Sequence, residues 1–171
     1  METAVVSLIC IALIVFGGMT MSHGFMTSVD AGTAGLEAAG QRNEIIMRTQ
    51  LSAVSTNMTA ADTLEVTLKN TGQTKLADFA KWDVIVQYHD DSGNARSTWL
   101  PYTNGTLGDN QWQVAEIQLN GAAEVIEPGV LNPGEEINIK AQLNPEVGAG
   151  TTNVVVIATP NGIPVETYFT Y

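Results

Sequence analysis

The chain has 171 residues, enough for one domain and an appendage, and 18 acidic residues against 7 Lys and Arg give a formal net charge of -11. Binding to nucleic acid or to an anionic membrane surface requires basic residues, so this composition argues against both kinds of partner for the folded surface. The single cysteine, Cys10, cannot form an internal disulfide, and its place in an apolar stretch indicates a membrane-facing or packing role.

The first element is an apolar stretch with no charged residue between Glu2 and Asp30. As a helix, its residues extend for roughly 40 Å, more than the roughly 30 Å of a bilayer core. A cleaved signal peptide is disfavoured because no basic region opens the stretch and the helical pattern continues beyond it. A plain membrane anchor fits the length but does not explain the small residues that let helices approach one another. These are Ala4, Ala12, Gly17, Gly18 and Gly24.

Residues 30–55 extend this helix as an amphipathic segment to about residue 54. A helix of roughly 50 residues that is apolar in front and amphipathic behind is not stable alone in water, so we expect a bundle of many copies. The residues expected to pack helix against helix are Val5, Leu8, Ile9, Ala12, Leu13, Phe16, Gly17, Gly18 and Phe25.

From Asp62 onward the pattern changes from helical to alternating. Apolar residues occupy every second position in 64–69 and again in 136–143, as a half-buried strand requires. Turn signals such as Asn70-Thr71-Gly72 separate the strands. The remaining predicted strands are 82–89, 97–100, 111–119, 153–159 and 164–171.

These patterns predict an α+β chain with a long hydrophobic N-terminal helix followed by an antiparallel Ig-like β-sandwich. The predicted helical segment is 1–56 and the predicted extracellular sandwich domain is 57–171. We expect residues 56–59 to form the connector between them.

Candidate sites of chemistry are few. His23 lies near the end of the apolar run, where we expect it at the membrane interface or against a bundle neighbour. His89-Asp90-Asp91 could offer metal ligands, but it precedes Ser92-Gly93 and lacks the spacing of a calcium loop, so we assign it to a hairpin tip. We therefore predict no catalytic residue, no metal and no cofactor. Asn57-Met58-Thr59 and Asn104-Gly105-Thr106 are candidate N-glycosylation sequons.

An apolar helix joined directly to an acidic, turn-rich β domain resembles the archaellins, the subunits of archaeal flagellar filaments, and more broadly the archaeal type IV pilin-like proteins. The specific local pieces are the opening helix, LEVTLKNTG at 64–72, VLNPGEEINI at 130–139 and TNVVVIATPNG at 152–162. In such families a membrane peptidase removes a short basic leader, so the missing basic region implies a mature form. Bacterial type IV pilins usually carry glutamate at the fifth mature position, whereas Val5 stands here and the acid is Glu2.

The resemblance implies a structural subunit of an extracellular helical filament used for swimming, polymerised through its N-terminal helix. It implies other copies of the chain as partners, the membrane before assembly, and an assembly ATPase with a membrane platform. The alternatives are a membrane-anchored, envelope-binding domain resembling an archaellum stator protein, and an adhesive pilus subunit. The helical pattern through residue 54 favours the filament, and an enzyme is the least favoured class.

Overall fold

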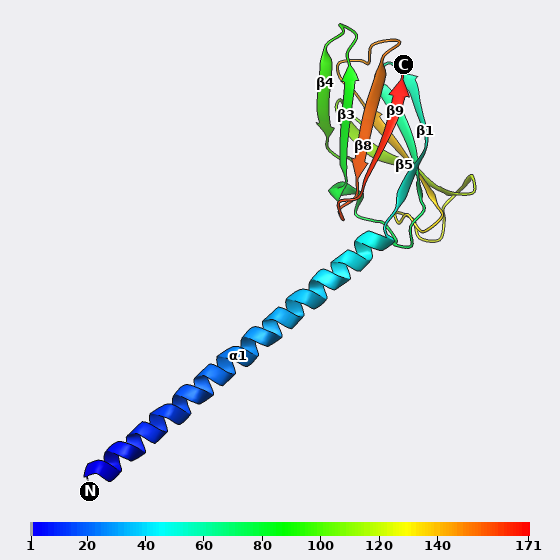
Figure 1. Cartoon of the computed structure of the whole chain (residues 1–171). Helices are drawn as coiled ribbons and strands as arrows, with labels where there is room; N and C mark the ends of the chain where they lie inside the picture. Colours follow the sequence, from blue (N-terminus) through cyan, green and yellow to red (C-terminus); the bar gives the residue numbers. More distant parts are fainter. Residues whose placement is uncertain (1) are drawn as a thin grey trace. The chain divides into compact units, whose positions relative to one another are not determined.

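The computed structural model describes residues Glu2–Tyr171, and it contains one long helix followed by short β-strands (Figure 1). Contacts divide the chain after Glu44, and the second unit is Ile45–Tyr171. Met1, the first residue of the predicted 1–56 segment, lies outside the described residues. A long helix followed by antiparallel sheets confirms the predicted α+β class.

The helix α1 spans Glu2–Arg48, 47 residues. Glu2 in its first turn and Arg48 in its last turn both complement the helix dipole. Four hydroxyl side chains donate to carbonyls of the preceding turn, for example Thr20 Oγ1 to Phe16 O at 3.1 Å and Thr27 Oγ1 to His23 O at 2.9 Å. Such bonds satisfy the hydroxyls within the helix itself.

The helix ends earlier than the sequence pattern indicates. Residues Leu51–Ala60 form strand β1, so the predicted helix to residue 54 and the predicted connector at 56–59 are both wrong. The Arg48 carbonyl accepts from the Gln73 N–H at 2.7 Å, and the Gln50 carbonyl accepts from the N–H of Thr71 and of Gly72 at 3.0 Å. These carbonyls would bond to later N–H groups if the helix continued, so tertiary hydrogen bonds end it here.

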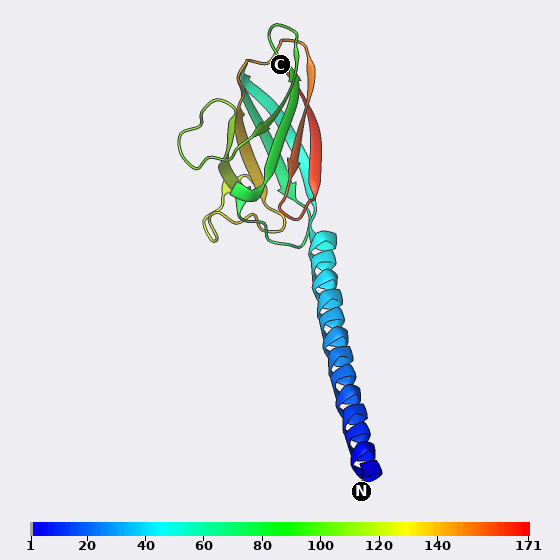
Figure 2. The same cartoon turned by 90° about the vertical axis from the view of Figure 1, so that its left-hand side faces the viewer.

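The second unit is a sandwich of two antiparallel sheets, seen from two sides in Figures 1 and 2. One sheet has the order β1-β2-β7-β5-β6 and the other β4-β3-β8-β9. A 3-10 turn, Phe79–Lys81, precedes β3. The strands after β1 are β2 (Thr63–Asn70), β3 (Asp83–His89), β4 (Ala95–Leu100), β5 (Gln111–Leu119), β6 (Ala122–Ala123), β7 (Glu136–Gln142), β8 (Thr152–Ala158) and β9 (Pro164–Thr170).

Alternate residues of the inner strands build the core between the sheets. Leu64, Val66 and Leu68 of β2 are no more than 1% exposed, and Ile137 and Ile139 of β7 are equally buried. Each predicted strand overlaps an observed one, because a period of two places every second side chain on the core face. The two strands that the sequence missed, β1 and β6, lie at the edges of their sheet, where burial and alternation are weakest.

Candidate assembly surfaces

The first candidate surface is the whole circumference of α1 between Glu2 and Asp30. Its apolar side chains are exposed, with Leu8 71%, Leu13 67% and Phe16 70% accessible. At about 100° per residue, most of the predicted packing residues lie on one broad side of the helix, and Gly18 and Phe25 lie on the opposite side. Ile11, Ile14 and Val15, which the sequence reasoning left out, are exposed on that opposite side as well. A helix that is apolar on all sides is suited to a membrane or to the centre of a bundle.

The structure places every residue of the predicted packing set on α1, where each is exposed. At Gly17, Gly18 and Gly24, an added Cβ would meet no described atom within 4 Å. Glycine costs about 1 kcal/mol in a helix relative to alanine. The packing role of the set therefore stays a prediction about neighbouring helices.

The apolar part of α1 is long enough and apolar enough to cross a membrane. Its best 18-residue window has a mean hydropathy of 2.5, by length and composition alone. The hydroxyls of Ser7, Thr20 and Thr27 lie in or beside this part, and each donates to a carbonyl three or four residues earlier. Groups satisfied in this way do not need water, which is a condition for a span in lipid.

The point where the helix passes into β1 is built by a close approach of two backbone segments. Thr49 is buried, and its hydroxyl donates to the Ile45 carbonyl at 2.7 Å. Gly72 packs directly on this turn, because a Cβ there would lie 2.5 Å from Arg48 O and from Gln50 N. A side chain at position 72 would therefore force these backbones apart.

Of the three residues considered as metal ligands, Asp90 bonds across the hairpin between β3 and β4 and holds it closed; this contact is called the Asp90 clamp. Asp90 is 2% exposed, and its carboxylate accepts from the Asn94 N–H at 2.7 Å and pairs with Arg96 at 2.8 Å. Burial by itself raises the pKa of Asp90, but hydrogen bonds from the Asn94 N–H, the Arg96 guanidinium and the Asn94 amide outweigh it and hold the pKa below its ordinary value. The hairpin tip predicted at His89–Asp91 is thus closed by an ionised carboxylate.

His23 is exposed on α1 and His89 is exposed on β3, in different units of the chain. Within Glu2–Tyr171 the structure brings together no group of three His, Cys, Asp or Glu side chains suited to a metal ion. Cys10 is exposed on α1 among the apolar residues.

The two sequons lie in different settings. Asn104 is exposed in the loop between β4 and β5, as predicted for a turn. Asn57 is also exposed, but it belongs to β1 and pairs with Glu65 of β2 instead of lying in a connector. Glycosylation at either position stays a prediction.

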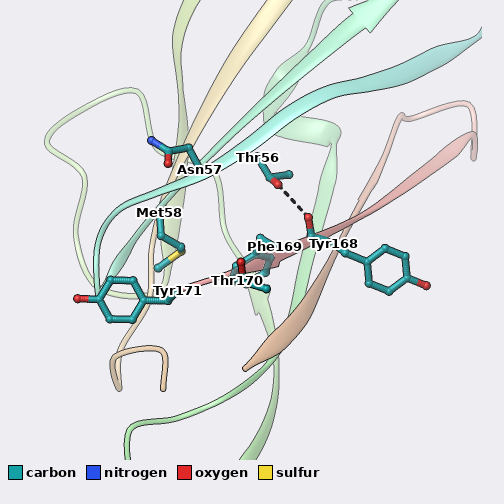
Figure 3. Close-up of a pocket in the computed structure, with 7 residues that line it drawn as sticks. All are labelled: Thr56, Asn57, Met58, Tyr168, Phe169, Thr170 and Tyr171. Atoms are coloured by element: carbon teal, nitrogen blue, oxygen red, sulfur yellow. Dashed lines mark hydrogen bonds between the residues drawn. The ribbon is translucent and has the colours of Figure 1, made fainter. Parts of the chain in front are cut away.

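A groove of about 380 Å³ lies where the edge strands β1 and β9 meet. The two strands belong to different sheets, and Thr56 Oγ1 of β1 donates to Tyr168 O of β9 at 2.8 Å (Figure 3). In Figure 3 the Met58 side chain points toward the Tyr171 ring, and Tyr168 points away from them. None of the described residues that line the groove has a charged side chain; they are Thr56, Asn57, Met58, Tyr168, Phe169, Thr170 and Tyr171.

The exposed helix and the closed sandwich agree with the comparisons to known proteins. The model of archaeal-type flagellins matches residues 2–169, nearly the whole chain. The chain belongs to the archaeal-type flagellin family. It is accordingly an archaellin, a structural subunit of the archaeal flagellar filament that serves motility, as its opening helix and strand motifs predicted. No curated protein sequence matches it.

Solved structures share the fold of this archaellin. The archaeal flagellum of Methanospirillum hungatei strain JF1 matches with a TM-score of 0.51 at 14% identity, covering 94% of this chain and 90% of that one. The archaellum periplasmic stator protein FlaG from Sulfolobus acidocaldarius matches with a TM-score of 0.54 at 22% identity, covering 71% of this chain and 99% of that one. The archaellum periplasmic stator protein complex FlaF and FlaG from the same organism matches with a TM-score of 0.52 at 22% identity, covering 71% of this chain and 89% of that one. At these identities, the likeness is one of fold.

Proposed function

We propose that α1 occupies two environments in succession, the membrane before assembly and the centre of the filament afterwards. The observation that supports this is the exposure of apolar side chains on all sides of α1 between Glu2 and Asp30, in a chain whose second unit has its own closed core. A helix that is apolar on every side is suited to lipid or to the centre of a bundle.

The length of α1 fits both environments. Its 47 residues extend for about 70 Å, whereas a bilayer core is about 30 Å thick. The uncharged residues between Glu2 and Asp30 supply the part that spans the membrane. The rest, which carries Asp30, Glu37, Arg42 and Glu44, remains outside the hydrocarbon and lengthens the bundle after assembly.

The same apolar surface makes the assembled state hard to reverse. Transfer from lipid to a helix bundle gains little hydrophobic energy, because lipid is as apolar as leucine. Extraction of a subunit from the bundle into water exposes about 20 apolar side chains at about 1.5 kcal/mol or more each, which is tens of kcal/mol before offsets. The filament therefore resists dilution, and an assembly ATPase acting through a membrane platform supplies the work of transfer.

The sandwich forms the outer coat of the filament, outside the cell. Its strong excess of acidic residues keeps neighbouring filaments apart, since like charges repel over roughly a Debye length of 8–10 Å. Asn57 and Asn104 are exposed on this coat and are the candidate glycan carriers.

Electron microscopy of material sheared from producing cells tests the proposal, with mass spectrometry to identify the chain. We expect uniform thin filaments made mainly of this protein, with a dense α-helical centre, and a membrane pool of the same chain awaiting assembly. Filaments whose centre lacks α1 would contradict the helical core.

A second candidate role, a membrane-anchored stator, has one observation in its favour, which is the fold shared with FlaG over 71% of the chain. The same shearing experiment separates the two. A stator stays in the membrane fraction and leaves it in detergent as small particles, whereas a filament subunit appears in the sheared polymer.

A further inference from the structure

Three asparagines of the sandwich are followed directly by glycine, in Asn104-Gly105, Asn120-Gly121 and Asn161-Gly162. An asparagine in such a pair can lose its side-chain amide, because glycine has no Cβ to hinder the approach of its main-chain nitrogen to the asparagine Cγ atom. The approach requires rotation about the Cα–C bond of the asparagine, which turns the peptide plane that carries the glycine N–H. The main-chain conformation and hydrogen bonds of each pair therefore decide whether the reaction proceeds in the folded chain.

The Asn120-Gly121 pair is fixed in a tight turn. It forms the two-residue turn between β5 and β6, where Leu119 pairs with Ala122. Asn120 and Gly121 have φ angles of 53° and 79°, the positive values that a type I′ turn requires at both positions. Rotation within Asn120 would separate the two strands, so this hairpin must open before the glycine nitrogen can reach Cγ.

The Asn161-Gly162 pair is held by main-chain hydrogen bonds in the loop between β8 and β9. The Gly162 N–H donates to the Thr159 carbonyl at 2.8 Å, and the Thr159 N–H donates to the Ile163 carbonyl at 3.1 Å. Gly162 also has a φ angle of 79°, in the left-handed region. The nitrogen that would react is thus engaged by a carbonyl, and the loop must open to release it.

The Asn104-Gly105 pair lacks these restraints. Both residues are exposed in the loop between β4 and β5, and neither has a φ angle in the left-handed region. Within the described part of the chain, neither takes part in a hydrogen bond between two main-chain groups. The Gly105 N–H donates to the Thr103 hydroxyl at 3.2 Å, and this side chain can turn away without movement of the main chain. Reaction at Asn104 therefore needs no opening of the sandwich.

We propose that Asn104 is a site of spontaneous conversion to aspartate and isoaspartate in the folded chain, and that Asn120 and Asn161 are protected. The Gly105 nitrogen gives up its proton and bonds to Asn104 Cγ, the Cγ–Nδ2 bond breaks, and the side-chain nitrogen takes up that proton and leaves as ammonia. Water then opens the resulting succinimide ring. Cleavage of the bond from the Gly105 nitrogen to Cγ gives aspartate, and cleavage of its bond to the main-chain carbonyl carbon gives isoaspartate. Nothing is oxidised or reduced.

This conversion and N-glycosylation exclude each other at Asn104. A glycan is attached through Nδ2, so it prevents the loss of that nitrogen as ammonia. Conversion in turn leaves a carboxylate, which is no acceptor for a glycan, and adds one negative charge to the loop. A copy of the chain that receives its glycan early thus keeps position 104 intact, whereas an unmodified copy changes with age. The proposal depends on the sandwich alone and not on the proposed filament.

The test compares the folded and the unfolded full-length chain. Thr106→Ala removes the sequon and keeps the Asn-Gly pair, so every copy of Asn104 carries a free amide. This variant is held in detergent at mildly alkaline pH, with and without urea, and peptide mass spectrometry follows the three asparagines. We expect folding to slow conversion of Asn120 and Asn161 by about tenfold or more, and that of Asn104 by less than about threefold.

Gly105→Ala in the same background is the matched control. Its Cβ has room in the loop but hinders the approach of the nitrogen to Cγ, so we expect most of the conversion at Asn104 to be lost and the rates at Asn120 and Asn161 to stay unchanged. Equal protection of Asn104 and Asn120 by folding, faster conversion of Asn161 than of Asn104 in the folded chain, or an undiminished rate in Gly105→Ala would each overturn the proposal. The measurement uses the chain in detergent, so its failure differs from an absence of filaments.

Discussion

The two units of this archaellin use the same residue types in opposite ways. In the sandwich, Leu64 and Leu68 are fully buried between two sheets, whereas Leu8 and Leu13 of α1 are 71% and 67% exposed. The sandwich thus buries its apolar residues between its own two sheets, whereas those of α1 are exposed along a single helix. One chain therefore combines a unit that has its own hydrophobic core with a helix whose uncharged part is apolar on all sides.

One optical signal distinguishes the two parts. All three tryptophans, Trp82, Trp99 and Trp112, lie in the sandwich. Tryptophan fluorescence of the full chain in detergent therefore follows unfolding of the sandwich alone, and filament counts by electron microscopy follow the helix.

The largest expected effect is on the sandwich. Trp112→Ala removes a fully buried ring that packs edge-on against Tyr102 at 4.9 Å between centroids. We expect it to lower the free energy of unfolding by about 3–5 kcal/mol, measured by urea denaturation with fluorescence detection. The matched control is Trp99→Ala, because Trp99 is 55% exposed. Equal losses from the two variants would show that the core is not where the structure places it.

The next effect is on the helix. Leu13→Arg places a charge in the apolar stretch, at a cost of about 2.5–3.5 kcal/mol near the bilayer centre, and it leaves the charge unpaired in a bundle. We expect loss of filaments with no change in the urea midpoint of the sandwich. Leu13→Met keeps volume and apolarity and should assemble as the parent does. Normal filament numbers from Leu13→Arg would argue against an apolar environment for this position.

A smaller effect is expected where the helix ends. Gly72→Ala drives a Cβ to 2.5 Å from Arg48 O and Gln50 N, so the two backbone segments must separate. We expect a loss of about 1–3 kcal/mol in the stability of the sandwich. Gly105→Ala is the control, since the nearest described atom is 3.7 Å away at Thr103 Oγ1, and its change should stay within about 0.5 kcal/mol. If Gly72→Ala left the free energy of unfolding unchanged, the backbone at Thr49–Gln50 would be able to move away from residue 72 at little cost.

The smallest effect is a change in pH dependence. The pKa of Asp90 is lower in the folded state than its ordinary value of 3.8, so the stability that its ionised form contributes is fully present above pH 3.8. That contribution is lost as the pH falls through the folded pKa. We expect the urea midpoint of the parent chain to fall more steeply than that of Asp90→Asn over roughly pH 5 to 2. If the urea midpoints of the parent chain and of Asp90→Asn fell equally with pH, the ionised Asp90 carboxylate would make no contribution to the stability of the folded state.

Much of this architecture was determined by the sequence alone. The absence of charge between Glu2 and Asp30 predicted a long apolar helix, and alternation in 64–69 and 136–143 predicted strands that the structure contains as β2 and β7. Both signals are local, because a helix period or a strand period follows from backbone geometry. The family motifs of the same segments predicted the filament role.

The tertiary structure decided where these elements end and which surfaces meet. The sequence pattern extended the helix to about residue 54. In the structure, however, N–H groups more than 20 residues further along the chain donate to the Arg48 and Gln50 carbonyls, and strand β1 begins there instead. The register of β1 shifts between Ala53 and Ser55, which breaks the alternation that would have marked it as a strand. The β1–β9 groove joins residues more than 100 positions apart in the chain, as the bond from Thr56 to Tyr168 shows. Such contacts depend on how the sheets pack, and no local period encodes them.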